Sequence, residues 1–288
     1  MSIALITKYT DMLDEVYALE SLTQDLDSDM ALTKAGANAN EIAIPKMTLQ
    51  GLANYSRTTG FVARTNTLEY ETVKFNFDRG GKFSVDAMDD EETQGVAFGM
   101  LAGEFERTKV IPEVDAFRFA MYAGLAGLYP SDATLSAGAD VLAAINVANG
   151  AMDEAEVPVE GRILYITPTL LNLVKNLDTT KSREALDAFK KIIRVPQTRF
   201  YTAIDQYDGT TGGEEAGGYV KDAAGKDLNF MIIHPSSVLQ FTKHKVSLAS
   251  GEGSNLDADA KVYRERLYAL VDAYDNKVKG IYRHNKAS

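Results

Sequence analysis

Hydrophobic and polar positions near the start of the chain follow a helical period. Between residues 11 and 26, apolar side chains recur at mostly helical spacing with acidic residues between them, and Thr10 can act as the N-cap. This predicts an amphipathic helix with an acidic outer face. The following stretch, "SDMALTKAGANANEIAIP", is rich in small and turn-forming residues without a sustained period, which predicts an extended arm.

From Ile42 to Val85 the pattern changes to that of β-strands. The stretch "NTLEYETVKFNFD" alternates with a change of phase near Thr72, which predicts a bulge or twist. The Gly80-Gly81 pair that follows can adopt the positive φ angles of a tight hairpin turn, after which alternation resumes. Residues 46–67 look like the outer part of a long loop, and we expect Arg57 and Arg64 near its tip.

The middle of the chain returns to helical spacing. Residues 89–127 are helical by composition and period, but Pro112 removes a backbone donor and crowds the carbonyl of Thr108. We therefore predict either one long helix with a kink near residues 108–112 or two helices end to end.

A separate α/β lobe is predicted for residues 138–230. Its first helix lies near "ADVLAAINVANGAM", and a second helix begins with Thr167 as N-cap and Pro168 as N1. Three apolar runs are candidate strands: "RILYIT", "KKIIRVP" and "LNFMIIHP". The glycine-dense stretch 207–227 is expected to form a mobile surface loop without regular structure. Beyond the lobe, two β segments flank a turn at residues 275–277, with sheet partners from far back in the sequence.

Composition and charge narrow the possible functions. The 288 residues are 45% hydrophobic and 25% charged, which is typical of a folded protein, and no apolar run reaches the length of a membrane span. The N-terminus becomes acidic where a signal peptide would be apolar, so we expect a cytoplasmic protein. The absence of cysteine excludes disulfides and cysteine-ligated metals, and the net charge of −11 argues against adhesion to nucleic acid.

An acidic cluster at residues 86–92 has two interpretations. Asp86, Asp89 and Glu92 could hold a divalent ion in a carboxylate-dependent hydrolase, although their spacing does not match an EF-hand loop. Alternatively, Asp89 and Glu92 form a capping box at the start of the long helix, and this interpretation is favoured.

The remaining candidate chemistry is sparse. His234, His244 and His284 show no metal-ligand spacing, and the sequence contains no nucleophile elbow or phosphate-binding loop. We expect no catalytic residue, no metal and no cofactor.

Together, the order of these elements resembles the major capsid protein family of tailed bacteriophages. The most specific stretch is residues 78–118, in which "DRGGKFSVDAMDDEET" is followed by "RTKVIPEVDAFR". Weaker similarity continues through "GRILYITP", "MIIHPSSV" and "DAYDNKVKGIY". The resemblance covers most of the chain.

The resemblance implies an α+β capsid fold and a division of the chain into five parts. These are an N-terminal helix and arm (1–41), an extended β-hairpin loop (42–85), a peripheral domain with a long spine helix kinked at Pro112 (86–137), an axial domain (138–230) and a return to the peripheral domain (231–288). The expected assembly residues are Arg57, Arg64, Arg79, Gly80 and Gly81.

In function, the resemblance implies a structural subunit that assembles with copies of itself into hexamers and pentamers of an icosahedral head. The head would enclose double-stranded DNA without sequence-specific binding or membrane contact, and would assemble in the bacterial cytoplasm. A separate scaffolding protein, a portal and a maturation protease are the expected partners. A nanocompartment shell of the same fold remains an alternative.

Overall fold

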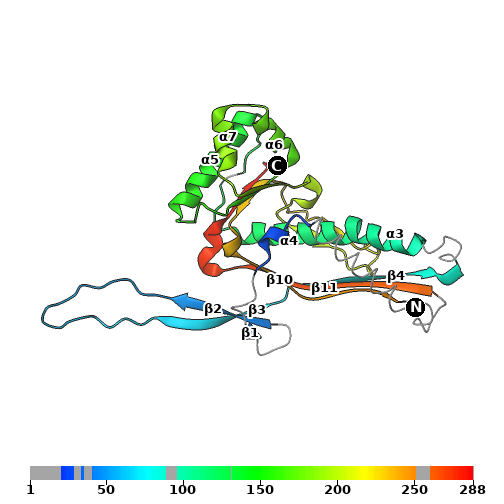
Figure 1. Cartoon of the computed structure of the whole chain (residues 1–288), viewed down its shortest axis with the longest axis horizontal. Coiled ribbons are helices and arrows are strands. Elements are labelled where there is room, and N and C mark those ends of the chain that lie inside the picture. Colours follow the sequence, from blue (N-terminus) through cyan, green and yellow to red (C-terminus); the bar gives the residue numbers. More distant parts are fainter. Residues whose placement is uncertain are drawn as a thin grey trace.

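The computed structural model describes residues 21–28, 34–35, 41–88, 96–130, 132–250 and 260–287, without the side chains of residues 34–35, 96–100 and 248–250. Its described parts fall into three regions (Figure 1). A lobe of helices and sheet lies on one side of a long helix, a sheet of long strands lies on the other side, and a β-hairpin projects from the end of that sheet. The mixed α+β architecture that the sequence predicts is confirmed.

The lobe is built on a four-stranded sheet in the order β12-β9-β5-β6. The pair β5 and β6 is parallel, whereas β9 is antiparallel to both β5 and β12. Its elements are α5 (Gly138–Glu154), β5 (Ile163–Ile166), α6 (Pro168–Lys175), α7 (Thr180–Asp187), β6 (Lys191–Arg194), β9 (Leu228–Ile233) and β12 (Ile281–Asn285). The predicted helices and three predicted strands of this lobe are thereby confirmed.

Strand β5 is buried on both faces, which explains its uninterrupted apolar sequence. Leu164 and Ile166 pack against the core that α5 and α6 cover, while Ile163 and Tyr165 face the core beneath the long helix. An apolar run with no polar alternation is typical of a strand between two layers.

The long helix consists of α3 (Val96–Phe105), a π-helical segment (Glu106–Val110) and α4 (Ile111–Leu125). Pro112 has no backbone N–H to donate to the carbonyl of Thr108, and the hydrogen bonding changes to the π type in the five residues before Ile111. The predicted irregularity near residues 108–112 therefore takes the form of a π-helical segment inside one continuous helix.

A three-stranded antiparallel sheet in the order β10-β11-β4 runs alongside this helix. It contains β4 (Phe77–Asp86), β10 (Val238–Ser250) and β11 (Ala260–Ala273). Phe77 of β4 and Leu267 of β11 pack against Val114 of α4. The partner of β11 is far back in the sequence, as expected. However, β12 pairs with β9 in the lobe, so residues 231–288 contribute strands to both sheets and do not form one returning unit.

Smaller elements connect these layers. They are the 3-10 turns at Gln24–Leu26, Gln197–Arg199, Pro235–Ser237 and Asp275–Gly280, the short strand β1 (Lys34–Ala35), and the hairpin β7 (Ile204–Gln206) with β8 (Tyr219–Lys221). The hairpin β7–β8 contradicts the expectation that residues 207–227 lack regular structure. Of the N-terminal helix predicted for residues 11–26, residues 11–20 lie outside the described residues, and residues 24–26 form a single 3-10 turn.

Candidate assembly interface

The projecting hairpin is the most exposed part of the described structure. It is formed by β2 (Glu41–Thr48) and β3 (Thr67–Lys74), which pair from Glu41↔Lys74 to Thr48↔Thr67 without a register shift. Beyond the paired strands, residues 49–66 extend away from the body and are closed by a turn in which Ser56 and Gly60 exchange backbone hydrogen bonds (Figure 1). Arg57 and Arg64 lie in this distal loop and are exposed, as the sequence predicts.

Large apolar side chains are concentrated on this hairpin and are exposed to solvent. Leu52 is 104% exposed and Phe61 is 90% exposed. Further exposed members of the same set are Met47, Leu49, Tyr55, Val62, Leu68 and Tyr70. Because single subunits rarely expose so many large apolar side chains on one element, the set marks an interaction surface. The sequence carries a signal for it, since residues 47–68, which hold all of these apolar residues except Tyr70, include no acidic residue.

The base of the hairpin is attached to the body by both apolar and ionic contacts. Ile42 and Ile44 are buried against β10 and β11, and the Phe75 ring stacks on Tyr268 with centroids 4.7 Å apart. On the surface, Lys46 Nζ lies 2.5 Å from Asp275 Oδ2. The change of phase near Thr72 reflects this geometry. The side chains of Thr67 to Thr72 are exposed on the projecting strand, whereas Val73 and Phe75 pack against the core. No bulge interrupts the pairing of β2 with β3.

Gly80 and Gly81 do not form the predicted hairpin turn. They lie within β4, where Gly80 pairs with Arg266 and Gly81 pairs with Glu265 of β11. A Cβ atom on Gly80 would lie 2.6 Å from the carbonyl oxygen of Glu265, and one on Gly81 would lie 3.0 Å from the Phe105 ring. The two glycines therefore permit close approach of neighbouring atoms and not a turn. The hairpin accordingly spans residues 41–74, and residues 77–85 belong to the other sheet.

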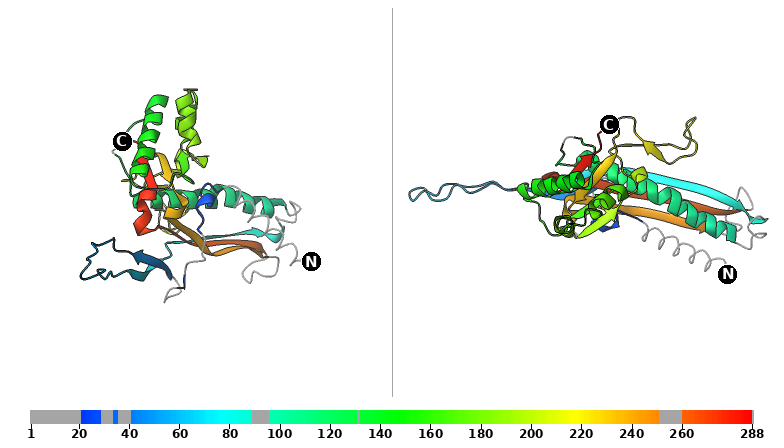
Figure 2. Two further views of the ribbon diagram at one scale, coloured as in Figure 1. Left: turned by 60° about the vertical axis from the view of Figure 1, so that its left-hand side comes forward. Right: turned by 90° about the horizontal axis from the view of Figure 1, so that it is seen from above.

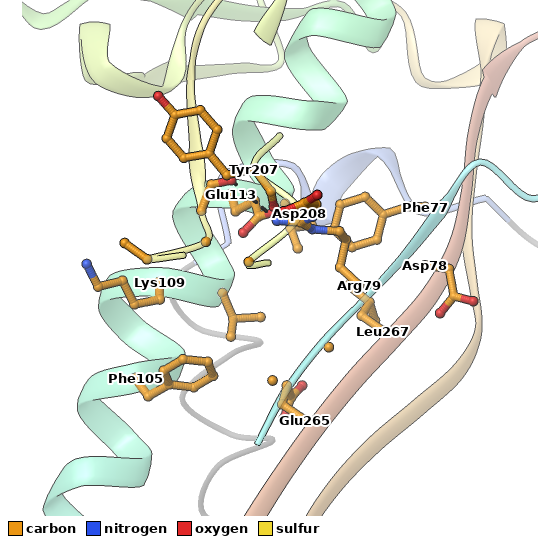
Figure 3. Close-up of a pocket in the computed structure, with 18 residues that line it drawn as sticks. Phe77, Asp78, Arg79, Phe105, Lys109, Glu113, Tyr207, Asp208, Glu265 and Leu267 are labelled. Carbon is orange, nitrogen blue, oxygen red and sulfur yellow. Dashed lines mark hydrogen bonds and ion pairs between the residues drawn. The ribbon is translucent and has the colours of Figure 1, made fainter. Parts of the chain in front are cut away.

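Arg79 makes its strong contacts within its own subunit. Its Nε donates to Glu113 Oε1 at 2.7 Å, and its Nη1 donates to the carbonyl oxygen of Tyr207 at 2.7 Å (Figure 3). It also donates through Nη2 to the carbonyl oxygen of Gly218. Arg79 thus ties β4 to α4 and to both ends of the β7–β8 loop.

A cavity of about 540 Å³ lies beside Arg79, between β4, the long helix and the β7–β8 loop (Figure 3). Phe77, Phe105 and Leu267 contribute apolar surface to its lining, together with Val110 and Val114. Its charged lining residues are Asp78, Arg79, Lys109, Glu113, Asp208 and Glu265.

Residues 21–28 are fastened to the long helix by a buried polar network. Asp115 accepts hydrogen bonds from the Thr23 hydroxyl at 2.9 Å and from the Leu22 amide at 3.1 Å, and Arg118 Nη1 donates to Thr23 Oγ1 at 2.7 Å. Burial raises the pKa of Asp115, while the Leu22 amide and the positive charge of Arg118 act in the opposite direction. Residues 21–28 are therefore part of the folded body.

Of the residues proposed for metal or acid-base chemistry, the structure describes only Asp86. Asp86 is exposed and accepts a hydrogen bond from the Met88 amide, which is a local turn contact, while Asp89 and Glu92 lie outside the described residues. In the part of the chain that the structure describes, no group of three or more potential ligands could hold a metal ion.

The three histidines occupy separate places in the fold. His234 Nε2 lies 3.0 Å from the Glu160 carbonyl oxygen, His284 is buried and stacks on Phe230, and His244 lies exposed on β10. Burial lowers the pKa of both His234 and His284. These contacts are structural.

Comparison with solved structures places this architecture among viral shells. The chain superposes on the asymmetric unit of the bacteriophage PhiM1 mature capsid with a TM-score of 0.61 and 12% sequence identity, covering 87% of this chain and 83% of that one. For the capsid of the cyanophage P-SCSP1u, the TM-score is 0.58 at 13% identity, with 93% and 88% covered. For a virus-like particle from Pyrococcus furiosus, it is 0.55 at 12% identity, with 97% and 99% covered.

These likenesses establish the fold. The chain has the fold of the subunits that build tailed-phage capsids, as its sequence motifs imply. No protein-family model matches the sequence, and no curated protein matches it. Among the described residues, no helix combines the length and apolar character needed to cross a membrane.

Proposed function

We propose that the protein is a structural shell subunit that assembles with copies of itself into the hexamers and pentamers of an icosahedral phage head. The observation that carries the proposal is the hairpin at residues 41–74, which leaves apolar side chains such as Leu52 and Phe61 without cover in the single subunit. An isolated two-stranded hairpin is marginally stable in water, so burial by a neighbouring subunit supplies what its own chain does not.

The fold supports the same function. The chain aligns along most of its length with capsid subunits. In this proposal the acidic net charge of −11 lets packaged duplex DNA lie against the shell without adhering to it. Assembly takes place in the host cytoplasm with a separate scaffolding protein, a portal and a maturation protease as partners.

Shortening the hairpin tests this function directly. A variant in which residues 50–65 are replaced by a two-residue Asn-Gly turn keeps the paired strands and the attachment at Lys46. We expect its circular dichroism and thermal unfolding to match those of the unassembled parent subunit, while sedimentation velocity and negative-stain microscopy show no closed shells. Normal shells from this variant would overturn the proposal.

A second candidate is a closed shell that encloses contents other than a phage genome. The observation in its favour is the likeness to the virus-like particle from Pyrococcus furiosus, of which this chain covers 99%. Nuclease-protected nucleic acid, measured in purified particles, separates the two. Genome-length protected DNA supports the phage head. Particles that contain protein but no protected nucleic acid support the alternative.

A further inference from the structure

The β7–β8 hairpin carries a concentration of negative charge. Residues 204–222, which we call the acidic hairpin, contain five acidic residues and a single basic residue, Lys221. The acidic residues are Asp205, Asp208, Glu214, Glu215 and Asp222. Lys221 forms its ion pair with Asp227, outside this set, and none of the five carboxylates has an ion-pair partner among the described residues. Partial burial raises the pKa of Asp205, and the negative charges of Asp222 and Glu214 raise it further, so these carboxylates repel one another within the subunit.

Strand β6 and its flanking residues have the opposite charge. Residues 188–196, "AFKKIIRVP", which we call the basic edge, contain Lys190, Lys191 and Arg194 and no acidic residue. All three basic side chains are exposed. Lys191 Nζ lies 2.5 Å from Asp25 Oδ2, whereas Lys190 and Arg194 have no ion-pair partner in the part of the chain that the structure describes. In those residues β6 pairs with β5 alone, so this side of the lobe ends in an unpaired strand edge.

The acidic hairpin and the basic edge lie on different sides of the lobe. The base of the acidic hairpin lies beside β12, since the Lys286 amide donates to the Asp227 carbonyl oxygen at 2.8 Å. Strands β12 and β6 are the two outer strands of the four-stranded sheet, and three strand spacings separate them by about 14 Å. Arg79 also holds both ends of the hairpin loop, through the carbonyl oxygens of Tyr207 and Gly218. The acidic hairpin therefore projects from the side of the lobe at which the chain ends (Figure 2, right).

From these features we infer that the acidic hairpin of one subunit docks against the basic edge of a second copy of this chain. This inference deepens the proposed function and rests on it.

The occupant of the basic edge is a second copy because the complementary charge is present in the same sequence and is held away from it in the same subunit. Opposite charges on two facing surfaces favour the correct partner and its orientation. Lysine and arginine on an edge strand also discourage indiscriminate pairing with another strand, which leaves a charged partner as the favoured one.

The contact joins two different surfaces of one chain, so it is heterologous. Each subunit offers its acidic hairpin to one neighbour and receives the hairpin of another at its basic edge. A contact of this kind repeats from subunit to subunit and produces a closed ring when the rotation allows closure. In the proposed shell, it therefore belongs within a hexamer or pentamer.

The absence of cysteine makes a cross-linking test specific. Gly212→Cys places a thiol in the exposed loop of the acidic hairpin, where nothing lies within 4 Å, and Ala188→Cys places one at the exposed start of the basic edge. The control chain carries Gly212→Cys with Asn276→Cys, whose position is exposed in the 3-10 turn at Asp275–Gly280.

Assembled particles of both chains are treated with a short bismaleimide and run on a denaturing gel. For the first pair of thiols we expect a ladder of linked chains that ends at the hexamer, because the ring closes there. For the control we expect unlinked chains. No ladder from the first chain, or equal ladders from both, would overturn the inference.

A charge-reversal series tests the electrostatic match. Lys190→Glu with Arg194→Glu is expected to lower the association constant of the subunits by at least about tenfold, because like charges then face each other. Sedimentation velocity over a range of concentrations measures this loss. Adding Asp205→Lys and Glu215→Lys in the same chain restores opposite charges across the contact and should restore assembly.

The matched control adds Glu154→Lys and Glu160→Lys to the same Lys190→Glu, Arg194→Glu chain. Both glutamates are exposed and lie outside the acidic hairpin, so the change in net charge is the same but the contact is not repaired. This control should not restore assembly.

These results separate the inference from the proposed function. Assembly that is unaffected by removal of residues 50–65 would refute the proposed function. Shells that form normally with Lys190→Glu and Arg194→Glu, or that are restored equally by both pairs of lysines or by neither, would refute only this inference.

Discussion

The carboxylate of Glu106 on the long helix lies 3.0 Å from the hydroxyl of Tyr263 on β11, and both side chains are fully buried. The same hydroxyl lies 2.6 Å from Glu265 Oε2, and Lys245 Nζ lies 3.3 Å from Glu106 Oε1. A hydroxyl carries one proton, so it can donate to only one carboxylate at a time. A proton on Glu106 would satisfy the other contact. Burial, followed by the charge of Glu265, raises the pKa of Glu106 to about 7.

The free energy of unfolding of the subunit should therefore fall as the pH rises from 4.5 to about 7. Glu106 binds its proton more tightly in the folded state than in the unfolded state, where the pKa is near 4.5. Below pH 4.5 both states are protonated, and between that value and about pH 7 only the unfolded state ionises, which favours unfolding. Glu106→Gln should remove this dependence and raise the free energy of unfolding at pH 8 by up to about 3 kcal/mol, at roughly 1.4 kcal/mol per pKa unit.

Urea unfolding of the unassembled subunit, followed by circular dichroism at several pH values, measures this effect. The difference between parent and variant should shrink toward zero near pH 5. A difference that is constant with pH would show that Glu106 does not titrate in this range.

Arg162 should be essential for the fold of the lobe. Its side chain is 2% exposed and donates to Asp153 Oδ1 and to the carbonyl oxygen of Val157, both at 2.7 Å. Arg162→Met should destabilise the subunit by about 1–3 kcal/mol, since the buried guanidinium group and its charged hydrogen bonds are lost. Arg183→Met is the matched control, because its ion pair with Asp178 is exposed, and it should cost at most about 0.5 kcal/mol. Equal melting temperatures for the two variants would contradict the role of Arg162.

Valine in place of Gly80 should damage folding itself. A Cβ at this position meets the backbone oxygen of Glu265, which cannot move without disturbing the pairing of β4 with β11. We expect a loss of about 1–3 kcal/mol. Gly81→Val should cost less, since its neighbour is the Phe105 ring, which can shift. Gly51→Val, where nothing lies within 4 Å, is the control and should melt like the parent. If Gly80→Val were as stable as Gly51→Val, the Glu265 carbonyl oxygen would not lie close enough to position 80 to exclude a side chain.

Thr23 should contribute measurably to stability through a single hydroxyl. It is fully buried and links Asp115 to Arg118, so Thr23→Val keeps the shape and removes both hydrogen bonds. We expect a loss of about 1–3 kcal/mol in urea unfolding. Thr58→Val in the exposed distal loop provides the comparison and should be nearly neutral. A neutral Thr23→Val would mean that residues 21–28 are not held by this network.

Parts of the candidate interface could be predicted from sequence. The long loop with Arg57 and Arg64 lies where the sequence pattern predicts it. It could be predicted because a stretch without periodicity between two alternating segments can be recognised from neighbouring residues alone. The exposure of Leu52 and Phe61 could not be predicted in the same way. Apolar residues in a loop look alike in sequence whether they are buried by their own body or by another chain.

The sequence by itself determined the buried strands and the helices of the lobe, together with the position of the irregularity before Pro112. Periodicity, uninterrupted apolar runs and a missing backbone donor act within a few residues, so they can be recognised in the sequence. Only the tertiary structure decided that Gly80 and Gly81 lie in a strand, that β12 joins β9, and that Arg79 turns inward to Glu113. Glycine serves positive φ angles and close contacts equally well, and the choice of strand partner depends on the packing of segments far apart in the chain.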